Sequence, residues 1–320
     1  MRILVTGGAG FIGSNFIHYI LETYPEYKIT NLDCLNYAGN LENLSDVAGN
    51  KNYKFVKGNI KDFKTVSKLI KEADYVINFA AQTHVDRSIK EAKDFIETNI
   101  NGVFTLLEAC RSFKIKLFIQ ISTDEVYGST FESSFIETDP LVPSSPYSAS
   151  KAAADCLACA YTATYKIPVI VTRCTNNFGP YQYPEKVIPL FITNLLQNKR
   201  LPLYGDGLNV RDWIYVYDHV RAIDFLMHKG KSGEIYNISS NNEVANIELT
   251  KLILNKFGLD EAYIEYVDDR PAHDRRYSLD SSKLRALGWK PVYDFSASLD
   301  ATIDWYKENA KWWKKIKQQK

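Results

Sequence analysis

A glycine-rich segment follows directly on the first β-rich run of the chain. Ile3–Thr6 leads into Gly7-Gly8-Ala9-Gly10-Phe11-Ile12-Gly13, and a helical pattern begins there. Glycines at a strand-to-helix turn let the backbone approach a pyrophosphate, whose charge the helix N-terminus receives. The segment predicts a dinucleotide-binding βαβ unit, and the residues expected at the cofactor are Gly7, Gly10, Phe11, Ile12 and Gly13.

A carboxylate stands about 20 residues beyond the last glycine, which is the usual distance to the ribose-binding acid. It belongs to Asp33, the last residue of the second β-rich run, Ile29–Asp33. A carboxylate there accepts hydrogen bonds from the adenosine ribose and repels a 2′-phosphate. We therefore expect NAD, and not NADP, as the cofactor.

Short β-rich runs alternate with helical patterns over the first 175 residues. This alternation predicts an α/β fold with a doubly wound parallel (Rossmann) sheet. The expected strands are Ile3–Thr6, Ile29–Asp33, Lys54–Lys57, Tyr75–Phe79, Leu117–Ser122 and Val169–Arg173. From Asn176 onward prolines interrupt the pattern, so residues 176–320 are expected to form a smaller, loop-rich C-terminal substrate domain. A helix at Val216–His228 and a strand at Ile235–Ile238 are expected to rejoin the first domain, which then comprises residues 1–175 and about 212–239.

Composition limits the classes of partner and compartment. The chain of 320 residues carries 39 Lys+Arg against 38 Asp+Glu, which gives no basic excess for nucleic acid. It lacks a signal-peptide pattern and an apolar run long enough for a membrane span, and its five scattered cysteines do not form a disulfide framework. Cys156 and Cys159 are expected to be small buried helix residues, and no metal site is expected. We expect a cytoplasmic protein that contacts no membrane, with Trp305–Lys320 as a solvated basic helix.

A tyrosine and a lysine are spaced i,i+4 at the start of a helical pattern after Pro146. Tyr147 and Lys151 then share one helical face, so the ammonium lies near the phenol. Together with the helix N-terminus and a positive nicotinamide ring, it is expected to lower the tyrosine pKa from about 10 toward neutrality. Tyr147 is thus predicted to take a hydroxyl proton while the carbon loses hydride. Lys151 is also expected to hold the nicotinamide ribose.

The spacing Gly7-x-x-Gly10-x-x-Gly13, joined to the Tyr147/Lys151 pair, resembles the extended short-chain dehydrogenase/reductases, which act largely on nucleotide sugars. Thr123 ends the strand that precedes the tyrosine helix. In the family that the chain resembles, Ser or Thr at that place hydrogen-bonds the substrate 4-hydroxyl. The resemblance therefore implies a catalytic set of Thr123, Tyr147 and Lys151 acting on a nucleotide sugar.

Two adjacent acids, Asp124 and Glu125, follow that threonine directly. Parallel sheets bind ligands at the carboxyl ends of their strands, which is where this pair falls. Oxidation at C4 alone needs only the tyrosine, whereas dehydration also needs a base for the C5 proton and an acid for the departing C6 hydroxyl. Paired acids in different protonation states suit that division of labour. The chain resembles the nucleotide-sugar 4,6-dehydratases, which implies that Asp124 is the acid and Glu125 the base.

The resemblance to the 4,6-dehydratases runs from Met1 to about Trp289 and includes Ala80–Ser88, Asn176–Tyr181, Pro184–Pro189, Gly205–Trp213 and Asp269–Tyr277. It implies dTDP-glucose or a close relative as substrate. The residues implied at the nucleotide sugar are Thr83, Asn176, Lys186, Val187, Arg211, Asn246, Arg270 and His273. Those implied near NAD are Asn59, Ile60, Ala80, Ala81, Thr98 and Asn177. Arg and Lys suit a diphosphate, and Arg binds it in a bidentate manner.

The chain departs from the family pattern at Asn59 and Gln82, where acids are usual. Asn59 still offers an acceptor to the adenine amino group. The helical segments Asp94–Phe113 and Tyr147–Tyr165 have long apolar faces, and family members dimerise through such a pair, so a homodimer is expected. The alternatives are a 4-epimerase or decarboxylase of the same fold, which the acid pair disfavours, and a non-catalytic NAD-binding regulator, which would not need the tyrosine.

Overall fold

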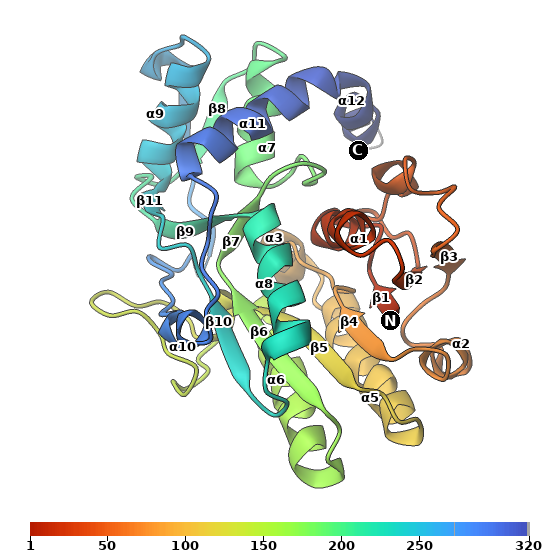
Figure 1. The fold of residues 1–320 in the computed structure, drawn as a ribbon. Coiled ribbons are helices and arrows are strands. Elements are labelled where there is room, and N and C mark those ends of the chain that lie inside the picture. Colours follow the sequence, from red (N-terminus) through yellow and green to blue (C-terminus); the bar gives the residue numbers. More distant parts are fainter. Residues whose placement is uncertain (272, 319–320) are drawn as a thin grey trace.

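A seven-stranded sheet forms the centre of the molecule, in the order β10-β6-β5-β4-β1-β2-β3, and every neighbouring pair of strands is parallel (Figure 1). The computed structural model describes residues 1–271 and 273–318, so the last two residues of the expected terminal helix lie outside the described part. The strands are β1 (Arg2–Thr6), β2 (Lys28–Asp33), β3 (Tyr53–Lys57), β4 (Tyr75–Asn78), β5 (Leu117–Thr123), β6 (Val169–Cys174) and β10 (Ile235–Ile238). The predicted doubly wound parallel sheet is confirmed.

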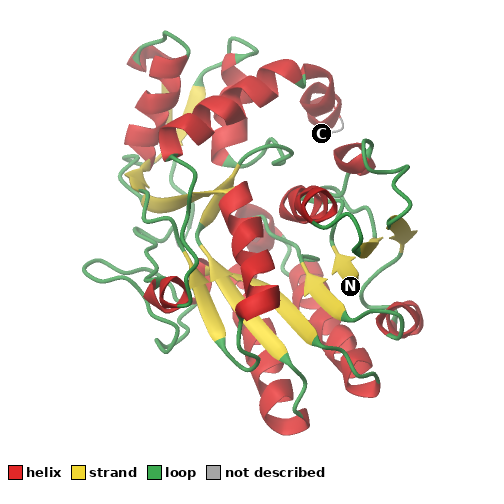
Figure 2. Cartoon of the chain, viewed as in Figure 1, coloured by secondary structure: helices red, strands yellow, loops and turns green. Residues whose placement is uncertain are grey.

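Helices cover both faces of this sheet (Figure 2). On one face α1 (Phe11–Thr23) and α8 (Val216–Lys229) pack against side chains such as Ile3 and Val5. On the other face α2 (Phe63–Ile70), α5 (Val103–Ser112) and α6 (Pro146–Tyr165) pack against side chains such as Leu4. Successive strand residues point to opposite faces, so β1 contributes to both cores.

The order of the strands reverses at β1, which lies between β2 and β4. Ligands of open α/β sheets bind at such a switch point, outside the carboxyl ends of the strands. Buried polar side chains connect three central strands near that edge. Thr6 donates to Asn78 Oδ1 at 2.6 Å, and Asn78 Nδ2 donates to Gln120 Oε1 at 2.8 Å. These hydrogen bonds satisfy polar groups that burial would otherwise penalise.

The helix expected over Asp94–Phe113 is not a continuous α-helix. It consists of α4 (Lys93–Phe95), a π-helical segment η2 (Ile96–Gly102) and then α5. Within η2, Asn99 exchanges hydrogen bonds with the backbone of Gln82 at 2.8 and 3.0 Å and donates to Ser150 Oγ at 2.8 Å. Asn99 in the π-helical segment thus links the loop after β4 to helix α6 by hydrogen bonds. Single π-helical turns of this kind occur frequently at functional sites.

The part beyond β6 is more regular than the loop-rich region that the prolines predicted. Its strands are β7 (Asn176–Phe178), β9 (Val210–Tyr215) and β11 (Glu243–Ala245), which form one sheet, and β8 (Leu201–Tyr204) and β12 (Ile264–Val267), which form a pair. Its helices are α7 (Val187–Leu195), α9 (Asn246–Lys256), α10 (Ser282–Ala286), α11 (Phe295–Glu308) and α12 (Ala310–Gln318). A further short helix, α3 (Val85–Lys90), follows β4. Pro189 lies in the first turn of α7 and Pro202 lies in β8, so the prolines did not exclude regular structure in this region.

The solvated terminal helix expected from Trp305 onward is wrong. The chain breaks at Asn309 into α11 and α12, and Trp312 and Trp313 are 8% and 1% exposed. Both pack into the apolar cluster of the second region, together with Tyr306. The lysines of α12 cover only its outer side, so the basic composition concealed a buried aromatic face. Figure 1 shows α12 next to the N-terminal part of the chain.

The paired cysteines of α6 also differ from expectation. Cys156 is exposed and Cys159 half-buried, because the outer side of α6 carries them. All five cysteines have free thiols. None of the described helices has the length and apolar character needed to cross a membrane.

Candidate active site

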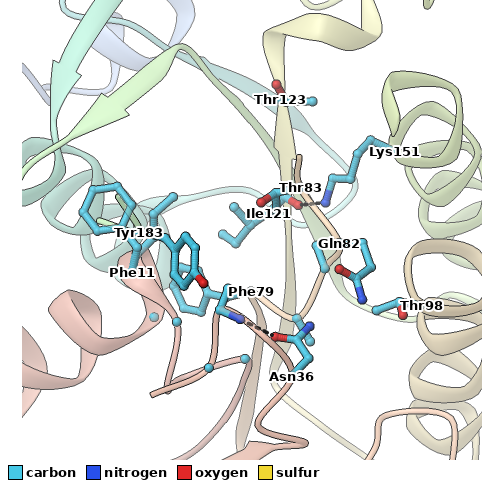
Figure 3. Close-up of a pocket in the computed structure, with 18 of the residues that line it drawn as sticks. Phe11, Asn36, Phe79, Gln82, Thr83, Thr98, Ile121, Thr123, Lys151 and Tyr183 are labelled. Atoms are coloured by element: carbon cyan, nitrogen blue, oxygen red, sulfur yellow. Dashed lines mark hydrogen bonds between the residues drawn. The ribbon is translucent and has the colours of Figure 1, made fainter. Parts of the chain in front are cut away.

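A cavity of about 450 Å³ opens at the carboxyl ends of β1, β2, β4, β5 and β6 (Figure 3). The residues predicted for catalysis all line it: Thr123, Asp124, Glu125, Tyr147 and Lys151. So do all those predicted for the cofactor: Gly7, Gly10, Phe11, Ile12, Gly13, Asp33, Asn59, Ile60, Ala80, Ala81, Thr98 and Asn177. Of the residues predicted for the substrate, Thr83, Asn176 and Lys186 line the cavity.

The glycine loop forms one wall of the cavity and leaves no room for side chains. Gly7 has φ +71°, and a Cβ there would lie 2.5 Å from the backbone nitrogen of Ala80. A Cβ at Gly13 would lie 2.5 Å from the carbonyl oxygen of Gly7. Helix α1 starts at Phe11 without a side-chain cap and without an acid in its first turn. The first-turn amides therefore remain suited to a phosphate.

Asp33 lies at the end of β2 and holds the loop in place. Its Oδ2 accepts from the Ala9 amide at 2.9 Å, and its Oδ1 accepts from the Leu35 amide at 2.8 Å. Burial raises the pKa of this carboxyl, and the two backbone hydrogen bonds oppose that rise. Each oxygen keeps a further lone pair for a ribose hydroxyl. The glycine loop and Asp33 together fit an adenine dinucleotide without a 2′-phosphate.

Helix α6 positions the tyrosine and the lysine. Ser145 caps the helix and exchanges hydrogen bonds with Ser148, and Pro146 occupies the first turn, so Tyr147 lies at the helix start. One turn further on, Lys151 points from α6 to β5, where its Nζ donates to the Ile121 carbonyl at 2.5 Å (Figure 3). Burial lowers the Lys151 pKa to about 8, against the charge of Asp155.

The groups of the chain that surround Tyr147 raise its pKa and do not produce the expected lowering. Burial raises this pKa well above 10, and the charges of Glu125 and Asp124 raise it further, whereas a hydrogen bond with Thr123 lowers it. Lys151 Nζ donates to the Ile121 carbonyl, and burial lowers the pKa of its ammonium. Positive charge bound beside the phenol would lower the Tyr147 pKa.

Two neighbouring carboxyl groups lie in contrasting environments at the end of β5. Asp124 is 3% exposed, and Thr123 Oγ1 donates to its Oδ1 at 2.9 Å. Burial, followed by the charge of Glu125, raises the Asp124 pKa to about 8. Its Oδ2 is buried and has no hydrogen-bond partner within the described residues. Burial therefore favours the neutral form of Asp124, and one of its oxygens is still available to a ligand.

Glu125 is half-buried, and burial raises its pKa as well. In its case three cations oppose the rise, in the order Lys186, Arg270 and Arg211. All three come from the part of the chain beyond β6. Because positive charge favours the carboxylate, Glu125 is the member of the pair that is better suited to accept a proton.

The same cations are also the predicted diphosphate ligands. Lys186 Nζ donates to the Thr83 carbonyl at 3.0 Å, and Arg270 pairs with Asp86 at 3.2 Å. Arg211 on β9 is buried, donates to the Asp274 carbonyl at 2.8 Å and stacks over Tyr277 at 4.1 Å.

Five of the predicted substrate residues lie outside the cavity lining: Val187, Arg211, Asn246, Arg270 and His273. Val187 and Asn246 are the first residues of α7 and α9. His273 Nδ1 is paired with Asp269 at 2.5 Å. Of these five, Arg211 and Arg270 act on the site through their charge, which lowers the pKa of Glu125.

The sequence analysis missed His219, which lines the cavity from α8. Its Nδ1 lies 2.8 Å from Asn177 Oδ1, and burial lowers its pKa to about 3, so the ring stays neutral. A histidine within an amphipathic helix carries no signal that distinguishes it from a core residue.

The two departures from the family pattern, Asn59 and Gln82, also line the cavity, and Asn59 Oδ1 accepts from the Lys61 amide at 2.9 Å. Among the described residues, no group of three or more His, Cys, Asp or Glu is arranged to hold a metal.

The fold and the site define a dinucleotide-binding enzyme of the extended short-chain dehydrogenase/reductase class. The family model for GDP-mannose 4,6 dehydratase matches residues 4–302. The chain therefore belongs to this family of nucleotide-sugar dehydratases.

Two relatives and two solved structures show how similar this chain is to individual proteins. The chain is 49% identical to the low-salt glycan biosynthesis protein Agl12 of Haloferax volcanii, covering 96% of this chain and 98% of the relative. It is 48% identical to a dTDP-glucose 4,6-dehydratase of Streptomyces niveus, covering 99% and 96%. The crystal structure of dTDP-glucose 4,6-dehydratase from Bacillus anthracis in complex with NAD matches with a TM-score of 0.93 and 51% identity, covering 99% of both chains. A UDP-glucuronic acid 4-epimerase from Bacillus cereus shares the fold with a TM-score of 0.91 and 28% identity, covering 96% of this chain and 99% of the other.

Proposed function

We propose that this protein is an NAD-dependent lyase that converts dTDP-glucose to dTDP-4-keto-6-deoxyglucose and water, the first committed chemistry of a rhamnose-type deoxysugar. The observation that supports this most is the Asp124–Glu125 pair directly after Thr123. One carboxyl is held neutral by burial and the other faces three cations. A 4-epimerase has no use for such a pair, since it moves no C5 proton and expels no hydroxyl.

The cavity has the groups needed to hold NAD. The glycine loop and the start of α1 would take the pyrophosphate, Asp33 the adenosine ribose, and Lys151 the nicotinamide ribose. Asn59, Ile60, Ala80, Ala81, Thr98 and Asn177 would line the rest of the cofactor site. Bound there, NAD supplies a reversible hydride acceptor, so that the hydrogen taken from C4 can be given to C6.

The side chains around the sugar divide the proton transfers between them. Thr123 hydrogen-bonds the C4 hydroxyl, and Tyr147 accepts its proton, a transfer that the positive charge of a bound NAD would favour. Glu125 then takes the C5 proton, which the new C4 ketone has made acidic. Asp124 gives its proton to the C6 hydroxyl, which leaves as water. The environments of the pair suit these roles, because burial favours the neutral form of Asp124, which can donate, and three cations favour the carboxylate form of Glu125, which can accept.

The diphosphate and nucleotide are assigned to the mouth of the site. Lys186, Arg211 and Arg270 carry the positive charge there, and the remaining contacts are proposed for Thr83, Asn176, Val187, Asn246 and His273. Asn176 Oδ1 is buried without a hydrogen-bond partner in the described part of the chain, which supports a ligand contact at that atom. A thymidine nucleotide is proposed because the relatives from Streptomyces niveus and Bacillus anthracis, which are 48% and 51% identical to this chain, are named dTDP-glucose 4,6-dehydratases.

A direct assay tests the function. The purified protein, supplied with NAD, is incubated separately with dTDP-glucose, UDP-glucose and GDP-mannose, and the products are identified by mass. The expected result is loss of one water from dTDP-glucose, with the other two nucleotides turned over much more slowly. An isomer of unchanged mass would indicate a 4-epimerase, and loss of water from GDP-mannose alone would reassign the nucleotide.

We further propose a homodimer and a cytoplasmic location. Ile96 and Phe104 on the η2–α5 helix and Tyr165 at the end of α6 are large exposed hydrophobic residues, 43%, 47% and 46% exposed, on adjoining helices. Exposed apolar side chains on adjoining helices suit contact with a second copy, and light scattering after gel filtration tests the dimer. The free thiols suit a reducing compartment.

The division into a cofactor domain, residues 1–175 with about 212–239, and a substrate domain within 176–320 stays a prediction, supported by the pairing of β10 with β6.

A further inference from the structure

The C-terminal helix α12 is connected to the glycine loop through one asparagine. Trp312 Nε1 donates to Asn43 Oδ1 at 2.9 Å, and Asn43 Nδ2 donates to the Ala9 carbonyl at 2.9 Å. Asn43 is 1% exposed and Trp312 8%, so both hydrogen bonds are shielded from water. The two bonds form a polar link between the end of the chain and its first loop, through Asn43, which is 269 residues from Trp312 and 34 residues from Ala9.

The Ala9–Gly10 peptide that this link contacts determines how the loop faces the cofactor. Its carbonyl accepts from Asn43 and from the Asn40 amide at 3.0 Å, and its N–H donates to the Gly7 carbonyl at 3.2 Å. On the other side of the same residue, the Ala9 amide donates to Asp33. Because a trans peptide is planar, fixing its two polar ends fixes the plane that leads into α1. The hydrogen bonds of Asn43 thus help to aim the first-turn amides at the cavity.

Helix α12 is itself held by the second region. The Trp312 ring packs edge-on against Trp305 at 5.1 Å and lies near Tyr306 and Tyr181. Lys315 adds a surface ion pair to Glu42, next to Asn43. The glycine loop is therefore positioned from outside its own βαβ unit. A loop rich in glycine needs such support, since its backbone has many alternative conformations.

We propose that α12 is a positioning element for the cofactor, and that the Trp312–Asn43–Ala9 link controls how tightly NAD is retained. The inference rests on the proposed function, in which the cofactor ends each cycle unchanged and so has no need to leave. The link touches neither the sugar site nor the carboxyl pair. Its loss is expected to speed NAD release and to leave the chemistry of the NAD-saturated protein intact.

Adjacent tryptophans provide a matched pair of variants. Trp312→Phe removes the donor to Asn43 and keeps an aromatic ring. Trp313→Phe removes an equally buried donor, whose Nε1 bonds the Tyr306 carbonyl at 2.8 Å inside the second region and does not reach the loop. Asn43→Leu has a similar volume and removes both halves of the link. The readouts are the dissociation constant for NAD by calorimetry on cofactor-stripped protein, the NAD content after purification, and kcat at saturating NAD.

Trp312→Phe is expected to weaken NAD binding by about tenfold, the effect of one buried hydrogen bond, whereas Trp313→Phe stays within about twofold of wild type. Asn43→Leu should weaken binding at least as much. A double variant that combines Trp312→Phe with Asn43→Leu should bind NAD no more weakly than Asn43→Leu alone, because both changes act on one link. All variants should keep kcat within about twofold at saturating NAD, as expected when only uniform cofactor binding is lost.

Equal NAD affinities for Trp312→Phe and Trp313→Phe, or additive losses in the double variant, would overturn the inference. If Trp312→Phe does not fold, Asn43→Leu measured against Trp313→Phe decides in the same way. Wild-type protein that binds no NAD at all would contradict the proposed function itself, and the inference with it, so the two failures can be told apart.

Discussion

Replacing Asp124 by asparagine is expected to stabilise the protein while it abolishes dehydration. The carboxyl is held neutral in the folded chain, where its pKa rises from 3.8 to about 8, but it is ionised in the unfolded chain at pH 7. A raised folded-state pKa contributes stability that is complete below pH 3.8 and is lost as the pH rises to about 8. Asparagine has no such penalty, and its Oδ1 can still accept the hydrogen bond from Thr123.

The size of the gain follows from the distance between the pH and the unfolded pKa. At about 1.4 kcal/mol per pH unit, the variant gains up to roughly 2 kcal/mol at pH 5 and roughly 4 kcal/mol at pH 7, and the gain levels off above about pH 8. For a chain of this length, roughly 1.5 °C of Tm corresponds to 1 kcal/mol. The expected gain in Tm is therefore up to roughly 3 °C at pH 5 and roughly 6 °C at pH 7.

Thermal unfolding at several pH values, with excess NAD present, measures this gain. Asp74→Asn serves as the control, because Asp74 pairs with Arg2 at 3.1 Å and its pKa is lowered, so the same substitution should cost up to about 1 kcal/mol at neutral pH. Product formation by Asp124→Asn should fall by a factor of about 10² to 10⁴. An Asp124→Asn protein that is less stable than wild type at pH 7, or a gain that does not depend on pH, would show that Asp124 is not a buried neutral acid.

Three further variants test the other members of the site. Glu125→Gln should stop deuterium exchange at C5 and product formation, and wild-type exchange in this variant would exclude Glu125 as the base. Tyr147→Phe should keep its packing but slow product formation by a factor of about 10² to 10⁴, so near-normal turnover would reject the tyrosine as proton acceptor. Lys186→Met removes the charge that most lowers the Glu125 pKa. The acidic limb of its pH–rate profile should therefore move to higher pH, and an unmoved limb would place Lys186 outside the field of the base.

The sequence contained most of the cofactor site because that site depends on short-range patterns. Gly7 and Asp33 lie at fixed offsets from strand ends, and the register of a parallel sheet brings those ends together. The state of Tyr147 could not be predicted in this way. The i,i+4 spacing places Lys151 on the same face, but it does not reveal that the ammonium bonds the Ile121 carbonyl or that burial dominates the phenol. The burial of Trp312 and its hydrogen bond to Asn43 could not be predicted either, because Asn43 lies near the other end of the chain.

The contrast between the two carboxyl groups shows how the fold divides the chemistry. Thr123 Oγ1 accepts from the Glu125 amide at 3.3 Å and donates to Asp124, so a single residue caps the turn and orients the pair. The sheet then buries Asp124, whereas the cations that face Glu125 all come from beyond β6. The two parts of the molecule thus act on the pair in different ways, because burial raises both pKa values, whereas Lys186 and Arg270 oppose that rise at Glu125. The second region therefore contributes charges that favour the carboxylate form of Glu125.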